Sequence, residues 1–253
     1  IDQYPMINKY LNDEGFVKHL FLSYGNDSYR NIATKWLSKV TEEKKIAALD
    51  TIRDYDRDTM LLIAADQGHA EIVEAIVSRP VYIGSIVRRK EVWRNAAEKG
   101  HTKVIEALLK AKNEQGENYF SIEGHDDNHN TALMWAAGMG HVETVKAILN
   151  HRGCNINAEN NGGITALMIA ADAGNTEVVK ELLAHRDKDR NPLIDINAKN
   201  NGGQTALMIA AKKGHVEIVK AILAHPEVNI NAKDSLGYTA LLNAVRKGHV
   251  EIV

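Results

Sequence analysis

The stretch Thr205-Ala-Leu-Met-Ile-Ala-Ala-Lys-Lys-Gly-His215 decides the fold of this chain of 253 residues, because it recurs along the sequence. Further copies, some close and some weaker, begin at Thr59, Glu91, Thr131, Thr165 and Thr239. Self-similarity at a fixed period is typical of a solenoid, in which each repeat packs only against its neighbours. The sequence therefore predicts a stack of repeats with a long exposed surface, and it predicts no enclosed pocket.

The spacing of the copies gives the length of the repeat. The last residue of each copy is His69, His101, His141, Asn175, His215 or His249, and the steps between them are 32, 40, 34, 40 and 34 residues. A unit of about 33 residues accounts for three of the steps. The extra residues of the two longer steps fall at Lys112 to Ser121 and at Arg186 to Pro192.

The recurring stretch has the residues of a short helix with defined ends. Thr205 is a good N-cap, because its hydroxyl accepts a hydrogen bond from a free amide of the first turn. Leu207, Ala210 and Ala211 are spaced to share one face, and paired alanines allow neighbouring helices to approach closely. Gly214 is placed to end the helix. We therefore expect an inner helix from Thr205 to Gly214 in this repeat.

A second helix and an extended arm complete the unit. We expect the outer helix to begin after His215, with its inward side chains at Val216, Val219, Ile222 and Leu223. The arm that follows is Asn229-Ile-Asn-Ala-Lys-Asp-Ser-Leu-Gly237, and matching arms begin at Asn155 and Asp195. Asn-Gly pairs in these arms indicate tight turns. We interpret the recurring asparagines as hydrogen-bonding turn residues at Asn157, Asn197 and Asn231.

This pattern resembles the ankyrin repeat, whose signature is a Thr-Pro-Leu-His-x-Ala motif in a unit of one β-turn and two helices. The resemblance covers residues 54–253. It implies an all-α solenoid of about six helix–turn–helix units, the last one truncated, with β-hairpin fingers. The family's Pro and His are replaced here by Ala and by Met134, Met168 and Met208. Pro at the first helical position helps a helix without being essential, and Met can pack in place of the His.

Residues 1–53 contain no copy of the repeat. Three amphipathic stretches, at residues 12–22, 27–40 and 41–52, predict helices there. Because the first repeat of a solenoid needs a cover and terminal units are atypical, we interpret them as a helical N-terminal cap. The alternative is a separate small domain with a function of its own. The chain begins at Ile1 and stops at Val253 inside a helical pattern, so we expect it to be part of something longer.

Composition narrows the class of protein. The formal net charge is −2, and a nucleic-acid binder usually has a basic excess, so we expect no nucleic-acid partner. The single cysteine, Cys154, permits no intrachain disulfide and suits a reducing cytoplasm. No apolar run approaches the roughly 18 residues of a bilayer span, and we expect no membrane insertion.

The histidines and the cysteine, which could in principle bind a metal or take part in catalysis, fit structural roles better than catalytic ones. The histidines that end the repeats recur far apart and cannot share one metal ion. His125 and His129 have the spacing of a helical zinc pair, but they fall in a polar finger. Cys154 lies near His151, and it occupies the slot of Ile194 and Val228, where a small apolar residue fits. We predict no catalytic residue, no metal, no cofactor and no small-molecule substrate.

The variable positions indicate a binding surface. In the ankyrin family the finger tips and the exposed side of the inner helix form the concave binding face. Carried onto this sequence, that face gives a predicted partner-binding set of Trp135, Met139, Ile164, Ile169, Ile209, Lys212, Lys213, Tyr238, Arg246 and Lys247. Its centre is apolar, and its charge changes from acidic or mixed to basic towards the last repeats. A partner with an apolar centre and an acidic end would fit. The alternative is that these side chains pack against neighbouring repeats.

The sequence thus predicts a non-enzymatic protein–protein interaction module that binds a partner protein on its concave surface. The Thr-Ala-Leu variant is similar to ankyrin proteins that intracellular bacteria deliver into host cells, which implies a scaffold or a secreted effector in the host cytosol. The alternative is a substrate-targeting region of a larger enzyme whose catalytic domain lies outside this chain.

Overall fold

The computed structural model describes residues 54–78, 86–112, 121–186 and 193–253. The predicted cap, residues 1–53, and most of the two insertions, residues 113–120 and 187–192, lie outside the described residues. What is described falls into two compact units, which are considered one at a time. One extends to Ala96 and continues from Lys103 to Ser121, and the other comprises Ala97–Thr102 and Ile122–Val253.

The first unit contains helices of the two predicted kinds, inner and outer. They are α5 (Asp54–Gln67), α6 (Ala70–Val77), most of α7 (Ile86–Glu98) and most of α8 (Thr102–Lys110). Helix α5 contacts α6. The fully buried side chains include Met60, Leu61, Ile72, Ile76, Ile105 and Leu108. Aliphatic packing between short helices therefore forms the core of this unit.

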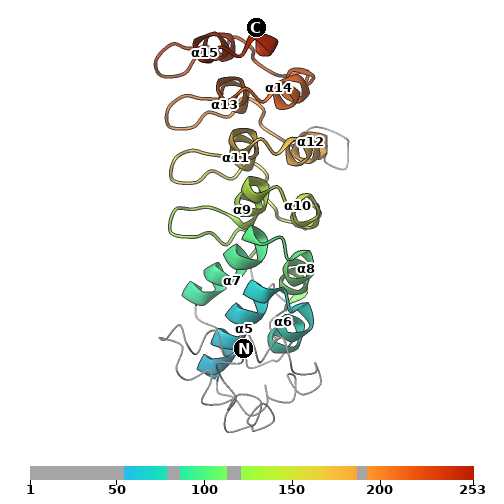
Figure 1. The fold of residues 1–253 in the computed structure, drawn as a ribbon. Helices are drawn as coiled ribbons and strands as arrows, with labels where there is room; N and C mark the ends of the chain where they lie inside the picture. Colours follow the sequence, from blue (N-terminus) through green and yellow to red (C-terminus); the bar gives the residue numbers. More distant parts are fainter. Residues whose placement is uncertain (1–53, 79–85, 113–120, 187–192) are drawn as a thin grey trace, which may run out of the picture. The chain divides into compact units, whose positions relative to one another are not determined.

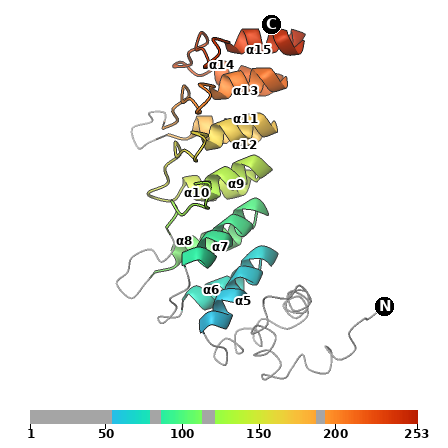
Figure 2. The same cartoon turned by 90° about the vertical axis from the view of Figure 1, so that its left-hand side faces the viewer.

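The second unit is a two-layer stack of helix pairs (Figure 1, Figure 2). Inner helices α9 (Ala132–Met139), α11 (Ala166–Ala173), α13 (Ala206–Lys213) and α15 (Ala240–Lys247) contact one another in that order. Outer helices α10 (Val142–Leu149), α12 (Thr176–Ala184) and α14 (Val216–Leu223) do the same, and the short η1 (Val250–Ile252) follows α15. The helix–turn–helix solenoid predicted from the repeats is confirmed.

The helix ends are those expected from the sequence. The Thr205 hydroxyl accepts a hydrogen bond from the Met208 amide at 3.4 Å, and Thr131, Thr165 and Thr239 cap their helices in the same way. Gly214 ends α13 with φ of +81°, in the left-handed region that favours glycine. Each inner helix of the second unit therefore has only eight residues, and the same cap begins each of them.

Small residues bring the inner helices together. The alanine pairs of α9, α11 and α13 are completely buried. The approach of α9 to α11 is close enough that a Cβ added to Gly138 would lie 2.9 Å from a methyl group of Ile169. Any larger residue at these positions would push the layers apart.

The outer helix differs in part from the expectation. Val219 and Ile222 are buried as predicted, but Val216 is only half-buried and Leu223 is 46% exposed. Ile218 is fully buried instead. At about 100° per residue, Ile218, Ile222 and Val219 share one face, and the two mispredicted residues both lie beyond its Val219 edge.

The fingers are turns held by side chains, and the described residues contain no regular strand. His125 and Thr131 form an isolated bridge. The Asn160 side-chain oxygen accepts hydrogen bonds from the amides of Gly162 and Ile164 at 2.9 and 3.0 Å. Successive fingers are joined by single backbone bonds, such as Asn201 N–H to Gly162 O at 2.9 Å. Within a finger the backbone bonds are those of a tight turn, such as Asn160 N–H to Ile164 O at 3.1 Å, so the predicted β-hairpins do not extend into regular strands.

The asparagines of the arms join neighbouring repeats. The Asn197 side chain donates to the Glu227 carbonyl and accepts from the Asn229 amide, both at 2.8 Å. Asn157 makes the same pair of bonds with Leu193 and Asp195. The interpretation as hydrogen-bonding groups is confirmed for Asn157 and Asn197, whose partners lie in the next repeat, and no such bond is made by the Asn231 side chain within the described residues.

The histidines that follow the inner helices also join neighbouring repeats. His141 Nε2 lies 2.9 Å from the Glu98 carbonyl, and His249 Nε2 lies 3.0 Å from the Lys212 carbonyl. Where the sequence has Asn175 instead, its amide donates to the carbonyls of Ala137 and Gly138 at 2.8 Å. These side chains therefore satisfy carbonyls at the end of the preceding inner helix.

Helix α15 shows what a neighbour contributes. Leu241, Leu242 and Val245 are about half exposed, whereas Leu207, Met208 and Ala211 at the same positions of α13 are buried. Helix α13 is covered by α15 on that side. Burial of the repeat's apolar positions thus requires an adjacent inner helix.

The apolar content of these helices stays below that of a membrane span. Within the described residues, no helix is both long enough and apolar enough to cross a bilayer.

We predict that Asn197→Ala destabilises the stack and that Asn231→Ala does not. The first change removes two bonds between repeats and lowers the free energy of unfolding by about 1–2 kcal/mol. The Asn231 side chain makes no bond to another repeat within the described residues, so its removal costs less than about 0.5 kcal/mol. Urea unfolding followed by circular dichroism measures both. Equal losses for the two variants would contradict a role for the arm asparagines in coupling repeats.

Candidate partner-binding groove

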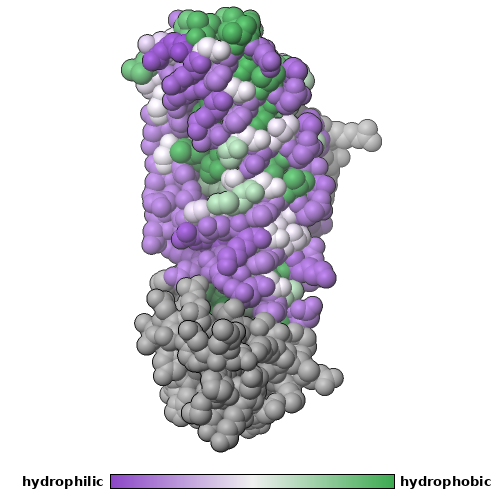
Figure 3. Space-filling view, viewed as in Figure 1, coloured by the Kyte–Doolittle hydropathy of each residue, from purple (hydrophilic) through white to green (hydrophobic). Residues whose placement is uncertain are grey.

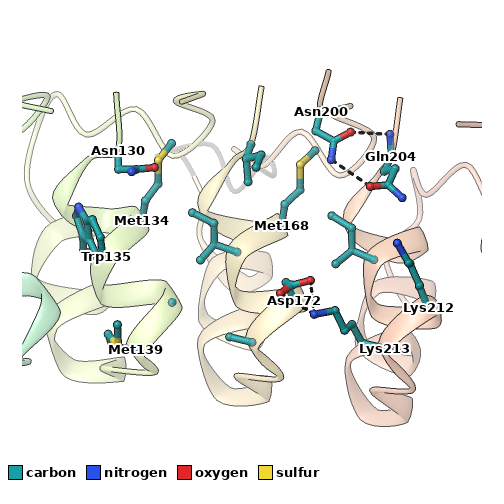
Figure 4. Close-up of a pocket in the computed structure, with 15 residues that line it drawn as sticks. Asn130, Met134, Trp135, Met139, Met168, Asp172, Asn200, Gln204, Lys212 and Lys213 are labelled. Atoms are coloured by element: carbon teal, nitrogen blue, oxygen red, sulfur yellow. Dashed lines mark hydrogen bonds and ion pairs between the residues drawn. The ribbon is translucent and has the colours of Figure 1, made fainter. Parts of the chain in front are cut away.

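A groove of about 560 Å³ lies across α9, α11 and α13 (Figure 4). Seven predicted partner-binding residues line it: Trp135, Met139, Ile164, Ile169, Ile209, Lys212 and Lys213. Figure 3 shows a hydrophobic area at the level of α9 and α11, with hydrophilic residues around it. The structure therefore brings most of the predicted set together at one place.

Helical spacing explains why these side chains meet. Trp135, Ile169 and Ile209 are each four residues after the threonine cap of their own helix. The residues three and four positions further on share their face, and they include Met139 and Lys213. The buried Leu and Ala-Ala residues occupy the other side of each helix. One face of the inner helix thus builds the core, and the next face lines the groove.

The lining side chains differ in exposure. Met139 is 50% exposed, and Trp135, Ile164 and Ile169 are half-buried. Ile209 is only 8% exposed, so the alternative of packing within the stack describes it better than full presentation to a partner. The apolar surface available for contact is concentrated over α9 and α11.

The remaining predicted residues lie beyond the groove. Tyr238, Arg246 and Lys247 do not line it. The Arg246 guanidinium carbon stands 4.4 Å from the centroid of the Tyr238 ring, in a cation–π contact. Lys247 is exposed on the last turn of α15. These three residues extend the basic side of the surface by one repeat.

Sequence reasoning missed several groove residues. They are Asn130, Met134, Gly138, Met168, Asp172, Ala173, Asn200 and Gln204. A signal existed for five of them. Asn130 and Gln204 precede a threonine cap as Ile164 does, and Gly138, Asp172 and Ala173 stand just before the glycine that ends the helix, as Lys212 and Lys213 do. Met134 and Met168 were expected to pack in place of the family's His, and both are buried while also lining the groove.

A family model for ankyrin repeats matches the chain in three overlapping copies, at residues 93–192, 152–234 and 191–253. Together these copies span more than half of the chain. The chain belongs to the ankyrin repeat family. No curated protein matches its sequence. Ankyrin repeats are in general protein–protein interaction modules, and the groove lies on the inner helices that such repeats stack.

An ion pair crosses the ankyrin groove. Lys213 Nζ lies 2.9 Å from the Asp172 carboxylate, and both side chains are about half exposed (Figure 4). Lys212 also lines the groove, and it has no carboxylate within ion-pair distance in the described part of the chain. Exposed pairs contribute at most about 1 kcal/mol, so the Asp172–Lys213 pair acts chiefly by cancelling charge in the groove.

The finger before α9 is built on Asp126, which also contacts the groove tryptophan. Its carboxylate accepts bonds from the amides of Asn128 and Asn130 at 2.9 and 2.8 Å. Burial raises the pKa of Asp126, but bonds from Asn130, Asn128 and the Trp135 side chain outweigh that effect, and the pKa lies below its ordinary value. The Asp126 carboxylate therefore links the finger to the groove.

His125 and His129 belong to the same finger. Their rings stack with centroids 4.0 Å apart, and His125 Nδ1 lies 2.9 Å from the Asp126 carbonyl. His129 has φ of +62°, where the equivalent residues of other fingers are glycines such as Gly163. The pair sits in a turn and not on a helix, so the helical spacing suggested by sequence does not apply.

Cys154 is half-buried, at the position that Ile194 and Val228 occupy in the later arms. Burial, together with the nearby Glu123 carboxylate, raises the pKa of the Cys154 thiol to about 12. A thiol with that pKa is protonated at neutral pH and is a poor nucleophile.

The lowered pKa of Asp126 predicts a pH dependence of stability. The carboxylate contributes stability that is complete above about pH 4 and is lost as the pH falls through its folded-state pKa. Asp126→Asn keeps the turn, because Asn160 and Asn200 hold it in other fingers, and removes this titration. We expect the difference in unfolding free energy between wild type and variant to be larger at about pH 7 than at about pH 3. Urea unfolding at both values measures it, and a difference that does not change with pH would refute the assignment.

Proposed function

We propose that this chain binds a segment of a partner protein in the groove over α9, α11 and α13, without catalysing a reaction. The observation that supports the proposal most directly is the groove itself, in which half-buried Trp135 and exposed Met139 face solvent beside Ile164 and Ile169. Trp is enriched among the residues that dominate binding energy, and Met adapts its shape to a partner.

The rigidity of the scaffold supports this function. Arm asparagines, end-of-helix histidines and finger bonds all connect one repeat to the next. A surface held in this way loses little conformational entropy when a partner binds. Recognition by a preformed groove is therefore the mechanism that we propose.

The surroundings of the cysteine and of the histidines support a role without catalysis. The thiol of Cys154 has a raised pKa, and the histidines that follow the inner helices lie beside backbone carbonyls. We include a cytoplasmic location in the proposal, because a reducing compartment suits a single, half-buried cysteine. The action of the chain as a scaffold or as an effector in a host cytosol remains a prediction from the sequence resemblance.

The double substitution Trp135→Glu and Ile169→Glu tests the site. It places two carboxylates on the apolar part of the groove, and we expect the loss of protein partners captured from cell lysate. Neither residue is fully buried, so the fold should survive, which circular dichroism checks.

A matched control adds the same charge elsewhere. Asn150→Glu and Ala184→Glu introduce two carboxylates at exposed positions, the C-cap of α10 and the last residue of α12. This control should keep every partner. If the groove variant is folded and captures the same partners as wild type, the proposed site is wrong.

A further inference from the structure

The chemistry of the groove specifies its partner further, on the assumption that the proposed function is correct. We infer that the partner segment has a bulky apolar side chain seated against Trp135 and Met139, and that carboxylates at its other end lie over α13 and α15. The segment thus has a defined direction along the stack. The inference rests on four observations: the charges of the inner helices, the charges of the fingers, the donors in the groove, and the extent of the basic surface.

The inner helices supply the first observation. The last turns of α13 and α15 contain Lys212, Lys213, Arg246 and Lys247, whereas the last turns of α9 and α11 contain no basic residue. Among the last turns of these four helices the carboxylate is Asp172, and it pairs with Lys213. The surface is therefore apolar over α9 and positive over α13 and α15.

The fingers change charge in the same direction. The residue before the turn is His125, Glu159, Lys199 and Lys233 in successive fingers. Asp126 and Asp127 stand beside the first of these, close to the α9 end. Asp234 follows Lys233, so the last finger has one charge of each sign, and the change from acidic to basic is clearest between the first and the third finger. Over that part of the stack the fingers change charge in the same direction as the inner helices.

The basic end of the groove also offers donors to a carboxylate. Asn200 donates to the side-chain oxygen of Gln204 at 3.4 Å, which leaves the Gln204 amide hydrogens without an acceptor in the described residues. Gln204 and Lys212 both line the groove, and both lie at its α13 end in Figure 4. An ammonium group and a side-chain amide together bind an anionic oxygen by charge-assisted hydrogen bonds.

The extent of the positive surface indicates a chain rather than a small acid. Arg246 and Lys247 lie outside the groove, one repeat further on. A ligand that touches both Trp135 and Lys247 must therefore be longer than the groove. A uniform polyanion such as a nucleic acid would bring phosphates to Asp126 and Asp127, which repel them. An acidic protein segment with an apolar anchor avoids that repulsion.

Basic residues in the last turn also stabilise a helix through its dipole. That effect acts on each helix alone and predicts no dependence of ligand binding on these lysines. Binding of defined peptides therefore separates the two roles, provided that each variant is shown to be folded.

The experiment selects dodecapeptides from a random display library on the immobilised wild-type chain and measures their affinities by fluorescence anisotropy. We expect the selected peptides to contain a bulky apolar residue and a block of Asp or Glu. Lys212→Gln with Lys247→Gln should weaken binding about tenfold. Each substitution removes one exposed ion pair with the peptide, and such a pair contributes about 1 kcal/mol or less. Asp172→Asn should strengthen it a few-fold, because Lys213 then loses its competing partner. Higher ionic strength should weaken binding in proportion to the charges involved.

The control Lys180→Gln with Lys220→Gln removes the same charge from α12 and α14 and should not change affinity. The Trp135→Glu, Ile169→Glu variant distinguishes the two proposals. Neutral or basic peptides that bind wild type but not this variant would overturn the acidic-partner inference and leave the groove as the site. Peptides that bind this variant as well as wild type, or no enrichment above a blank surface, would overturn both. Binding of oligothymidylate that depends on Lys212 and Lys247 would overturn the choice of a protein segment.

Discussion

The structure depends on how closely one inner helix can approach the next. Ala170 and Ala171 have no exposed surface, and Gly138 leaves no room for a Cβ against Ile169. This distance lets the side-chain amide of Asn175 reach the carbonyls of Ala137 and Gly138 on the preceding helix. The bonds between repeats therefore depend on the small residues, since a wider spacing of the helices would break these bonds, which make the stack stiff.

The same approach creates the groove. When neighbouring helices bury their leucine and alanine faces against one another, the next face of each helix is drawn into one continuous surface. Trp135 and Ile169 line a shared hollow because their helices touch, although they are a repeat apart in sequence. The groove is thus a consequence of core packing, and changes to the core alanines would alter it without touching any lining residue.

The repeating residues made most of this architecture predictable. Thr205 and Gly214 fix a helix by local chemistry that needs no knowledge of its neighbours. The groove was only partly predictable, because its properties depend on contacts between repeats. Ile169 and Ile209 have the same register, yet the first is half-buried and the second is 8% exposed. Asp172 and Lys213 are 41 residues apart in sequence, and no sequence pattern predicts that they form an ion pair. The β-hairpin fingers were predicted from the family pattern, and in the described residues they are tight turns without regular strands, because the backbone bonds of a finger stay within one turn.

The finger before α9 departs from its relatives in ways that bear on the groove. Its turn is built on Asp126, as the last finger is built on Asp234, where the two fingers between them use Asn160 and Asn200, and Asp126 also lies beside the groove tryptophan. A carboxylate is a stronger acceptor than an amide oxygen, and the Trp135 side chain contributes to the lowered pKa of Asp126. Because Trp135 is the largest apolar group of the groove, a charged finger residue beside it bears on the α9 end of the surface. Residues that vary between repeats are therefore not independent here, since a finger residue and a helix residue meet at one end of the groove.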